Sequence, residues 1–227
     1  MFKRISIIVF TVLMLLTGCR SPEFTSALMY VNENNLEKAE EFFEKALIIE
    51  PENALVPYLY ARDILLPEER WNEMVDMFDK ANTLNPDTPL EKPIVIDGII
   101  YSTVSQGSDA YREQEWGKIF NKAVEYYDKK ETIEAAELLN IAIKVYPKKG
   151  NTYATLASFY IESDDYSSAK KTAEAGLIQD PENLFILQVS ADIAQKNGEL
   201  EKAVAFMEKA LSFSDEKCTL LRKLIYI

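Results

Sequence analysis

Small residues recur along the chain at helical spacing and at one longer, fixed interval. Ala135, Ala169 and Ala203 are equally spaced, and a second small residue follows each of them two helical turns later. The pairs are Ala135 with Ala142, Ala169 with Gly176, and Ala203 with Ala210. Both members of a pair therefore lie on one helix face. The longer interval fits two helices of roughly 12–15 residues and two short turns, and it predicts an array of helix pairs.

The same frame extends toward the N-terminus. The corresponding positions are occupied by Ala39, Phe43, Ala46 and Pro51, and again, shifted by one residue, by Met74, Phe78, Ala81 and Pro86. A small residue lets two helix backbones approach closely, because the side chains at a crossing set the distance between helix axes. The prolines, including Pro147 and Pro181 in later units, cannot continue a helix and so end it.

These positions resemble the tetratricopeptide repeat, whose period of about 34 residues matches the interval between the alanines. The best match is the unit 150–183, where the motif positions are held by Tyr153, Leu156, Ala157, Tyr160, Ala169, Gly176 and Pro181. The unit 54–88 departs most, with Met74 at the small position and Pro67 near the end of its first helix. The resemblance implies an all-α, right-handed superhelical solenoid of about five units. Two units fall in 19–88 and three in 116–217.

The segment 89–115 interrupts the frame. It carries a dense apolar run over 94–104, followed by Gln106-Gly107-Ser108-Asp109, and a helical pattern resumes from about Asp109. One interpretation is a degenerate helix that fills space between two half-arrays and lengthens the helix after it. The other is a segment that lies in the groove of the array or contacts a partner.

The C-terminal residues predict one more helix. Ser214 can cap it, and Leu220, Leu221, Leu224 and Ile225 give it an apolar stripe. Since the last repeat of an array exposes an apolar face, we expect a capping helix that ends over 218–227. The alternative is self-association through the stripe. Cys218 is expected to be a small buried residue of this helix, the alternative being a reactive thiol.

The segment 1–18 reads as an export signal. Lys3 and Arg4 precede a short apolar run over 5–16, which is too short to span a membrane. The following Leu16-Thr17-Gly18-Cys19 resembles a bacterial lipobox, which implies that Cys19 is acylated and becomes the first mature residue. An ordinary cleaved signal or a short anchor is the alternative. Arg20 is not the aspartate that favours inner-membrane retention in Gram-negative sorting. If the organism is Gram-negative, the resemblance therefore favours the outer membrane, facing the periplasm.

Composition narrows the function. The formal net charge is −12, and loss of Lys3 and Arg4 takes it to about −14. Such an acidic chain disfavours nucleic acid as a partner. The acidity serves solubility or, alternatively, a basic protein partner. With no histidine, the commonest general base and metal ligand is missing, and no glycine-rich phosphate loop occurs. We expect no catalytic residues, no metal and no cofactor.

The resemblance places partner binding on the first helices of the units, which line the concave face. The groove positions it implies are Phe120, Val124, Tyr127, Ala154, Ser158, Ile161, Phe185, Gln188, Asp192 and Gln195. None is basic, so a clamp for a terminal carboxylate is not expected, and an extended or helical peptide segment suits the groove better. Phe120, Val124 and Tyr127 have an alternative role as core residues under the insert.

The expected function is a membrane-anchored scaffold or assembly factor for an envelope complex, binding an envelope protein or peptide segment. The alternative is a lipoprotein that binds a small molecule or hydrophobic ligand in a pocket made by the insert and the groove.

Overall fold

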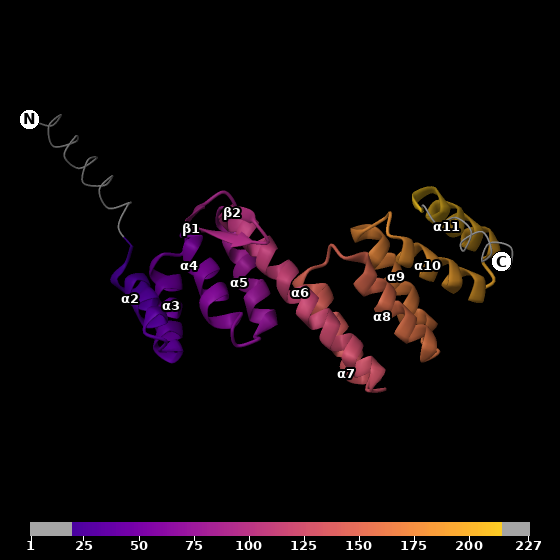
Figure 1. Cartoon of the computed structure of the whole chain (residues 1–227), viewed down its shortest axis with the longest axis horizontal. Helices are drawn as coiled ribbons and strands as arrows, with labels where there is room; N and C mark the ends of the chain where they lie inside the picture. Colours follow the sequence, from indigo (N-terminus) through magenta and orange to yellow (C-terminus); the bar gives the residue numbers. More distant parts are fainter. Residues whose placement is uncertain (1–19, 215–227) are drawn as a thin grey trace, which may run out of the picture. The chain divides into compact units, whose positions relative to one another are not determined.

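The computed structural model describes residues 20–214, which fall into two compact units (Figure 1). The first unit ends at Ser108 and the second begins at Asp109. The export signal, Cys19, Cys218 and the expected capping helix over 218–227 lie outside the described residues.

The first unit holds two helix pairs. They are α2 (Pro22–Asn32) with α3 (Leu36–Ile49), and α4 (Leu55–Tyr60), continued by the π-helical turn η1 (Ala61–Leu65), with α5 (Trp71–Leu84). The second pair, which departs most from the repeat pattern, is packed as fully as the first. Met74, Phe78 and Ala81 are all completely buried. The unbranched, flexible methionine side chain fits where the other units place a small residue.

A β-hairpin follows, in place of the helix expected over the start of the insert. Strand β1 (Pro89–Ile96) pairs antiparallel with β2 (Ile99–Thr103). The expectation of a degenerate helix is wrong here for reasons legible in the sequence. The prolines Pro89 and Pro93 oppose a helix, β-branched residues favour a strand, and Asp97-Gly98 supplies the left-handed φ angles of 51° and 81° that a two-residue turn needs.

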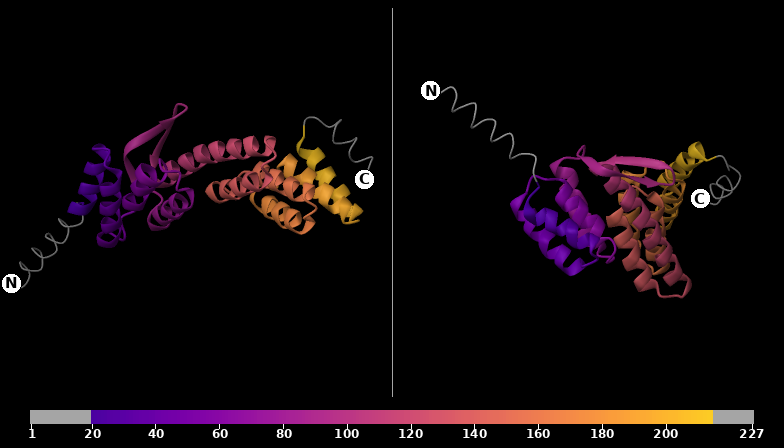
Figure 2. Two further views of the ribbon diagram at one scale, coloured as in Figure 1. Left: turned by 90° about the horizontal axis from the view of Figure 1, so that it is seen from below. Right: turned by 60° about the vertical axis from the view of Figure 1, so that its left-hand side comes forward.

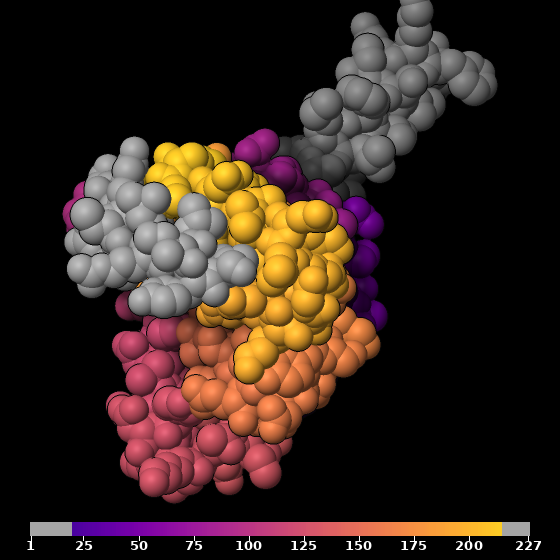
Figure 3. All heavy atoms as spheres, turned by 90° about the vertical axis from the view of Figure 1, so that its right-hand side faces the viewer, coloured from indigo at the N-terminus to yellow at the C-terminus, as the bar shows by residue number. Residues whose placement is uncertain are grey.

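The helix after the hairpin is longer than a repeat requires, as the same interpretation expected. It is α6 (Val104–Asp128), and it is followed by α7 (Thr132–Val145), α8 (Gly150–Glu162), α9 (Tyr166–Gln179), α10 (Leu184–Lys196) and α11 (Leu200–Phe213). Helix α10 contacts both α8 and α9, so the last two pairs are stacked. Figure 3 shows the yellow surface of the last pair lying directly on the orange surface of the pair before it.

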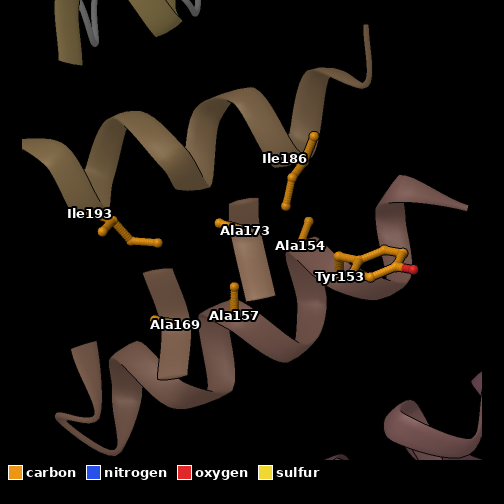
Figure 4. Packing of buried hydrophobic residues seen from close by; sticks show 7 residues of the cluster. All are labelled: Tyr153, Ala154, Ala157, Ala169, Ala173, Ile186 and Ile193. Carbon is orange, nitrogen blue, oxygen red and sulfur yellow. The ribbon is translucent and has the colours of Figure 1, made fainter. Parts of the chain in front are cut away.

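Alanines occupy both sides of the helix crossings. On the second helix of every pair except the one with Met74, the buried alanines at the crossing are Ala39, Ala135, Ala169 and Ala203, all completely buried. On the first helix of each pair the buried alanines are Ala27, Ala61, Ala123, Ala157 and Ala191. Figure 4 shows Ala157, Ala169 and Ala173 between α8 and α9, with Ile186 and Ile193 of α10 closing the cluster. Methyl-sized side chains at these places let the backbones approach closely.

The turn inside each helix pair has a left-handed residue at the same position and the same backbone hydrogen bond. The N–H of the residue directly after the left-handed one donates to the carbonyl five positions earlier, for example Asn35 to Tyr30 at 2.9 Å and Asp165 to Tyr160 at 2.8 Å. The residues with positive φ are Asn34, Glu69, Lys130, Asp164 and Gly198. This is a Schellman ending, which satisfies carbonyl groups that the helix leaves open.

The one extra residue of the second helix pair is absorbed by η1. The step from Ala27 to Ala61 equals the repeat period, whereas the step from Tyr30 to Leu65, the matched residues at the Schellman turns, is one residue longer. The insertion therefore falls between Ala61 and Leu65, the bounds of the π-helical turn. There the N–H of Leu66 donates to the carbonyl of Ala61 at 2.9 Å, five positions back, as a π-helix requires. The widened turn keeps both helices in their usual places.

We predict opposite effects on stability for two glycine-to-alanine substitutions. A Cβ at Gly176 would lie 2.7 Å from Tyr153 Cβ and 3.0 Å from Ile186, so Gly176→Ala should destabilise the second unit by about 1–3 kcal/mol. A Cβ at Gly117, within α6, meets nothing within 4 Å, so Gly117→Ala should stabilise by about 0.5–1 kcal/mol. Urea unfolding of both variants measures the difference, and equal midpoints would contradict the close packing at Gly176.

We also predict that Lys130→Gly stabilises the chain. Lys130 has a φ of 66°, a conformation that costs a side-chain-bearing residue roughly 1 kcal/mol relative to glycine. Lys129→Gly, next to it but without a positive φ, is the matched control and should not stabilise. A rise in melting temperature for Lys130→Gly alone supports the turn geometry, and a fall would contradict it.

Candidate functional site

The second unit carries a hollow of about 250 Å³ bounded by three helices. Its lining comes from α6, α8 and α10, the first helices of three successive pairs, and consists of Phe120, Asn151, Ala154, Thr155, Ser158, Phe185 and Val189. Helix α10 contacts α8 as well as α9, and α8 contacts α7, which is the stacking by which repeat arrays bring their first helices to one face.

Helix α8 forms the floor of this hollow. Asn151, Ala154, Thr155 and Ser158 follow the spacing i, i+3, i+4, i+7, which places them on one helix stripe. The hydroxyl of Ser158 donates to the carbonyl of Ala154 at 2.9 Å, and that of Thr155 to the carbonyl of Asn151 at 2.9 Å. Because both hydroxyl groups donate to backbone carbonyls of their own helix, they add little polarity to the hollow, and its floor is nearly neutral.

Two phenylalanines make the sides. Phe185 at the start of α10 is 61% exposed, which is unusual for so large an apolar side chain. Phe120 on α6 is half-buried, with its ring 5.5 Å from that of Trp116. Trp116 is fixed in turn, because its indole N–H donates to Thr152 Oγ1 at 2.8 Å. The hollow therefore has one supported aromatic wall and one open aromatic edge.

The structure brings together only part of the groove expected from the sequence. Phe120, Ala154, Ser158 and Phe185 line the hollow, whereas the other expected groove residues do not. Those outside its lining are Val124, Tyr127, Ile161, Gln188, Asp192 and Gln195. Asp192 is exposed and Gln188 half-buried on α10, and Val124 is 37% exposed on α6.

Tyr127 is held by its neighbours at the end of α6. Its ring stacks on Phe159 with centroids 4.3 Å apart, and its hydroxyl donates to both carboxylate oxygens of Glu162, at 3.0 and 2.8 Å. The hydrogen bond to Glu162 is the main reason that the pKa of Tyr127 is raised. Phe120 and Tyr127 also pack against a buried cluster around Ala123 and Leu139. Part of each side chain therefore belongs to the core, as the alternative interpretation of the sequence expected.

Three lining residues were missed from the sequence: Asn151, Thr155 and Val189. Each lies three or four residues from a position that was found, so the helical spacing on α8 and α10 carried the signal. Asn151 is also held in place, since its Oδ1 accepts from Asn183 Nδ2 at 2.8 Å.

The first unit has a hollow at a comparable place, with different chemistry. It measures about 290 Å³ and lies among α2, α4 and β1. Its floor is apolar, with Leu28, Val31, Leu55, Leu59 and Leu90, and its rim is charged, with Arg20, Arg62, Asp63, Glu91 and Lys92. Arg62 binds Asp63 through two nitrogens, at 2.6 and 2.7 Å. Here strand β1 of the insert forms one wall.

Residues 20–214 contain neither a candidate metal site nor a candidate membrane-spanning helix. No group of three or more Cys, Asp or Glu side chains in this range is placed to hold a metal ion. No helix in the same range is long and apolar enough to cross a membrane.

Comparison with known proteins identifies the repeat. A family model described as the tetratricopeptide repeat matches residues 24–53 and 186–217. These segments cover the first and last helix pairs of the described chain. No curated protein matches the chain at a significant level.

Solved structures of repeat proteins are similar at low identity. YrrB, titled a TPR protein with an unusual peptide-binding site, is 16% identical, covers 94% of this chain and 96% of its own, and has a TM-score of 0.42. MamA is 14% identical, covers 85% of this chain and 96% of its own, and has a TM-score of 0.41. The Yersinia enterocolitica type III secretion translocator chaperone SycD is 13% identical, covers 51% of this chain and 91% of its own, and has a TM-score of 0.46.

The assignment of the repeat therefore follows from the family model and from the repeating geometry of the chain, and not from these structures. The family model matches the first and last helix pairs, and the described chain repeats the same helix pair with a Schellman turn within it. The chain contains tetratricopeptide repeats in an all-α repeat fold, which is typical of protein–protein interaction scaffolds.

Proposed function

We propose that this chain is a lipid-anchored adaptor whose second unit holds a peptide segment of an envelope protein. The observation that carries the proposal is the hollow between Phe120 and Phe185, an aromatic-walled site on the face that repeat arrays present to partners. An exposed phenylalanine beside a nearly neutral floor is the arrangement expected of a binding anchor rather than of a reaction centre.

The chemistry of the hollow selects the partner class. No lysine or arginine is among its lining residues, while Asp192 and Glu162 are exposed on the same helices, α10 and α8. We expect a segment that inserts one or two apolar side chains between the phenylalanines, with basic residues flanking them. The amide nitrogen of Asn151, whose Oδ1 is already bound to Asn183, can donate to a backbone carbonyl of that segment.

The anchor is the other half of the proposal. The lipobox-like residues before Arg20 support acylation of Cys19, and Arg20 itself supports an outer-membrane location facing the periplasm. The net charge of −12 supports a protein partner over nucleic acid.

The competing function is that of a carrier for a hydrophobic ligand, and the hollow of the first unit is the site to consider for it. There, Leu90 of the hairpin and Leu59 of α4 line the same hollow. Five charged residues on its rim make it a poor match for a wholly hydrophobic ligand, because each charge near such a ligand loses hydration. The peptide adaptor therefore remains the stronger proposal.

We predict that Phe120→Ala with Phe185→Ala abolishes partner capture. Truncating two anchor side chains should lower affinity by about a thousandfold, since such anchors each cost about 2 kcal/mol or more when removed. The measurement is crosslinking of the acylated protein in intact cells, followed by affinity purification. Phe213→Ala is the matched control, because Phe213 is a 42% exposed phenylalanine outside the hollow. Equal recovery of the same partner by all variants would contradict the groove assignment.

We predict that Cys19→Ser abolishes palmitate incorporation and leaves a precursor that keeps its export signal. The reason is that acylation of this thiol precedes processing in the lipobox pathway that the sequence resembles. Metabolic labelling and the mass of the purified chain measure both effects. Cys218→Ser is the control and should leave labelling unchanged, whereas a processed, labelled Cys19→Ser chain would refute the anchor.

A further inference from the structure

The hairpin presents aliphatic side chains to solvent. Val95, Ile99 and Ile100 are 64%, 57% and 66% exposed, and Val95 lies directly across the strand pair from Ile100. In the left view of Figure 2 the hairpin stands out from the helices of the first unit. Because Val95 and Ile100 are paired across the strands, both project from one face of the hairpin, whereas Ile99, the residue before Ile100, projects from the other face. Two paired β-branched residues left in water indicate a surface that something covers.

The other face of the hairpin is held against the helices. Leu90 is 7% exposed, and Ile94 lies so close to Gly107 that a Cβ there would be 3.0 Å from Ile94 Cδ1. The same Cβ would meet the ring of Tyr58 of α4. The hairpin is thus seated by one face, and its exposed side chains belong to the part that the helices do not cover.

Addition of a partner strand is not favoured at either edge of the hairpin. Pro89 and Pro93 in β1 have no N–H to donate. In β2, the N–H of Ser102 already donates to Gln106 Oε1 at 2.9 Å. The surface offered to a partner is therefore the side-chain face rather than a backbone edge.

The hairpin is also close to the proposed point of acylation. Arg20, the residue after Cys19, forms an ion pair with Glu91 of β1. From Glu91 to Ile96 a strand advances about 17 Å, at roughly 3.3 Å per residue. The exposed side chains therefore lie within about 25 Å of a lipid attached to Cys19, when one extended residue is added.

We infer that the face formed by Val95 and Ile100 rests in the interfacial region of the lipid bilayer to which the chain is anchored. This inference depends on the acylation of Cys19 proposed above. A bilayer suits the patch because two aliphatic side chains are too few for a stable protein interface, which needs about 800 Å² per partner. Lys92, exposed on the same strand as Val95, is a residue type that places an apolar body in lipid and a polar end at the headgroups.

Charge determines how the hairpin sits. A chain of net charge −12 gains nothing from anionic headgroups, so the contact depends on apolar burial. Asp97, at the turn, keeps its carboxylate out of the hydrocarbon. The hairpin therefore lies along the surface on its Val95–Ile100 face and does not enter tip first.

The test places a fluorescent label at this face. The full-length acylated chain carrying Cys218→Ser and Ile100→Cys is labelled with bimane and reconstituted into phosphatidylethanolamine–phosphatidylglycerol vesicles. Ile178→Cys is the matched control, an isoleucine of α9 that is 78% exposed. Val95→Cys is a second probe of the same face in case Ile100→Cys disturbs folding.

The inference expects brominated lipid to quench the label at residue 100 or 95 but not at 178. Iodide in the water should quench the hairpin labels at least about threefold less than the control, because interfacial burial shields them. Equal iodide quenching at all sites would overturn the inference, and vesicle flotation then shows whether the anchor also failed. Shielding from iodide without quenching by brominated lipid would also overturn it, and would indicate a protein surface or a second copy of the chain instead.

Discussion

The close approach of paired helices at methyl-sized side chains is the constraint on which this structure depends. Apart from the pair that contains Met74, each helix pair buries an alanine on its first helix and an alanine on its second, as with Ala157 and Ala169, which share one buried cluster. Because larger side chains would push the helix axes apart, these positions fix the spacing within a pair. Gly176 shows how little room is left, since even one added methyl group would meet Tyr153 and Ile186. The helices that line the hollow of the second unit are placed in this way.

The constraint acts on geometry and leaves the chain some freedom in sequence. Met74 stands where the other units have alanine and is still completely buried. The extra residue in the same helix pair does not shift the frame of α5, because the π-helical turn at Ala61–Leu65 takes it up before the Schellman turn is reached. A side chain that can bend and a helix that can widen by one residue therefore preserve the same crossing.

The helix pairs could be predicted from the sequence because one period is repeated in alanines and prolines, and an array needs only neighbouring contacts to be consistent. The hairpin could not be predicted from that frame. Its isoleucines fit a helical run, although Pro93 and the Asp97-Gly98 turn indicate strands. Of the groove residues expected from the sequence, Phe120, Ser158 and Phe185 line the hollow, but Gln188 and Asp192 do not. Which turn of α10 meets α8 depends on packing angles that no single helix pattern contains.

Two adjacent positions on the first helix of each pair show how such a scaffold separates folding from recognition. The first of the two positions is a buried alanine in every pair, at 27, 61, 123, 157 and 191. The next residue, one step around the helix, is Leu28, Arg62, Val124, Ser158 and Asp192 in turn. Of these, Leu28 and Arg62 line the charged-rim hollow of the first unit, and Ser158 lines the nearly neutral hollow of the second. Since the neighbouring alanine already fixes the backbone, each of these side chains can change the chemistry of its unit without altering the helix crossing, and the two hollows can serve different ligands on one repeated frame.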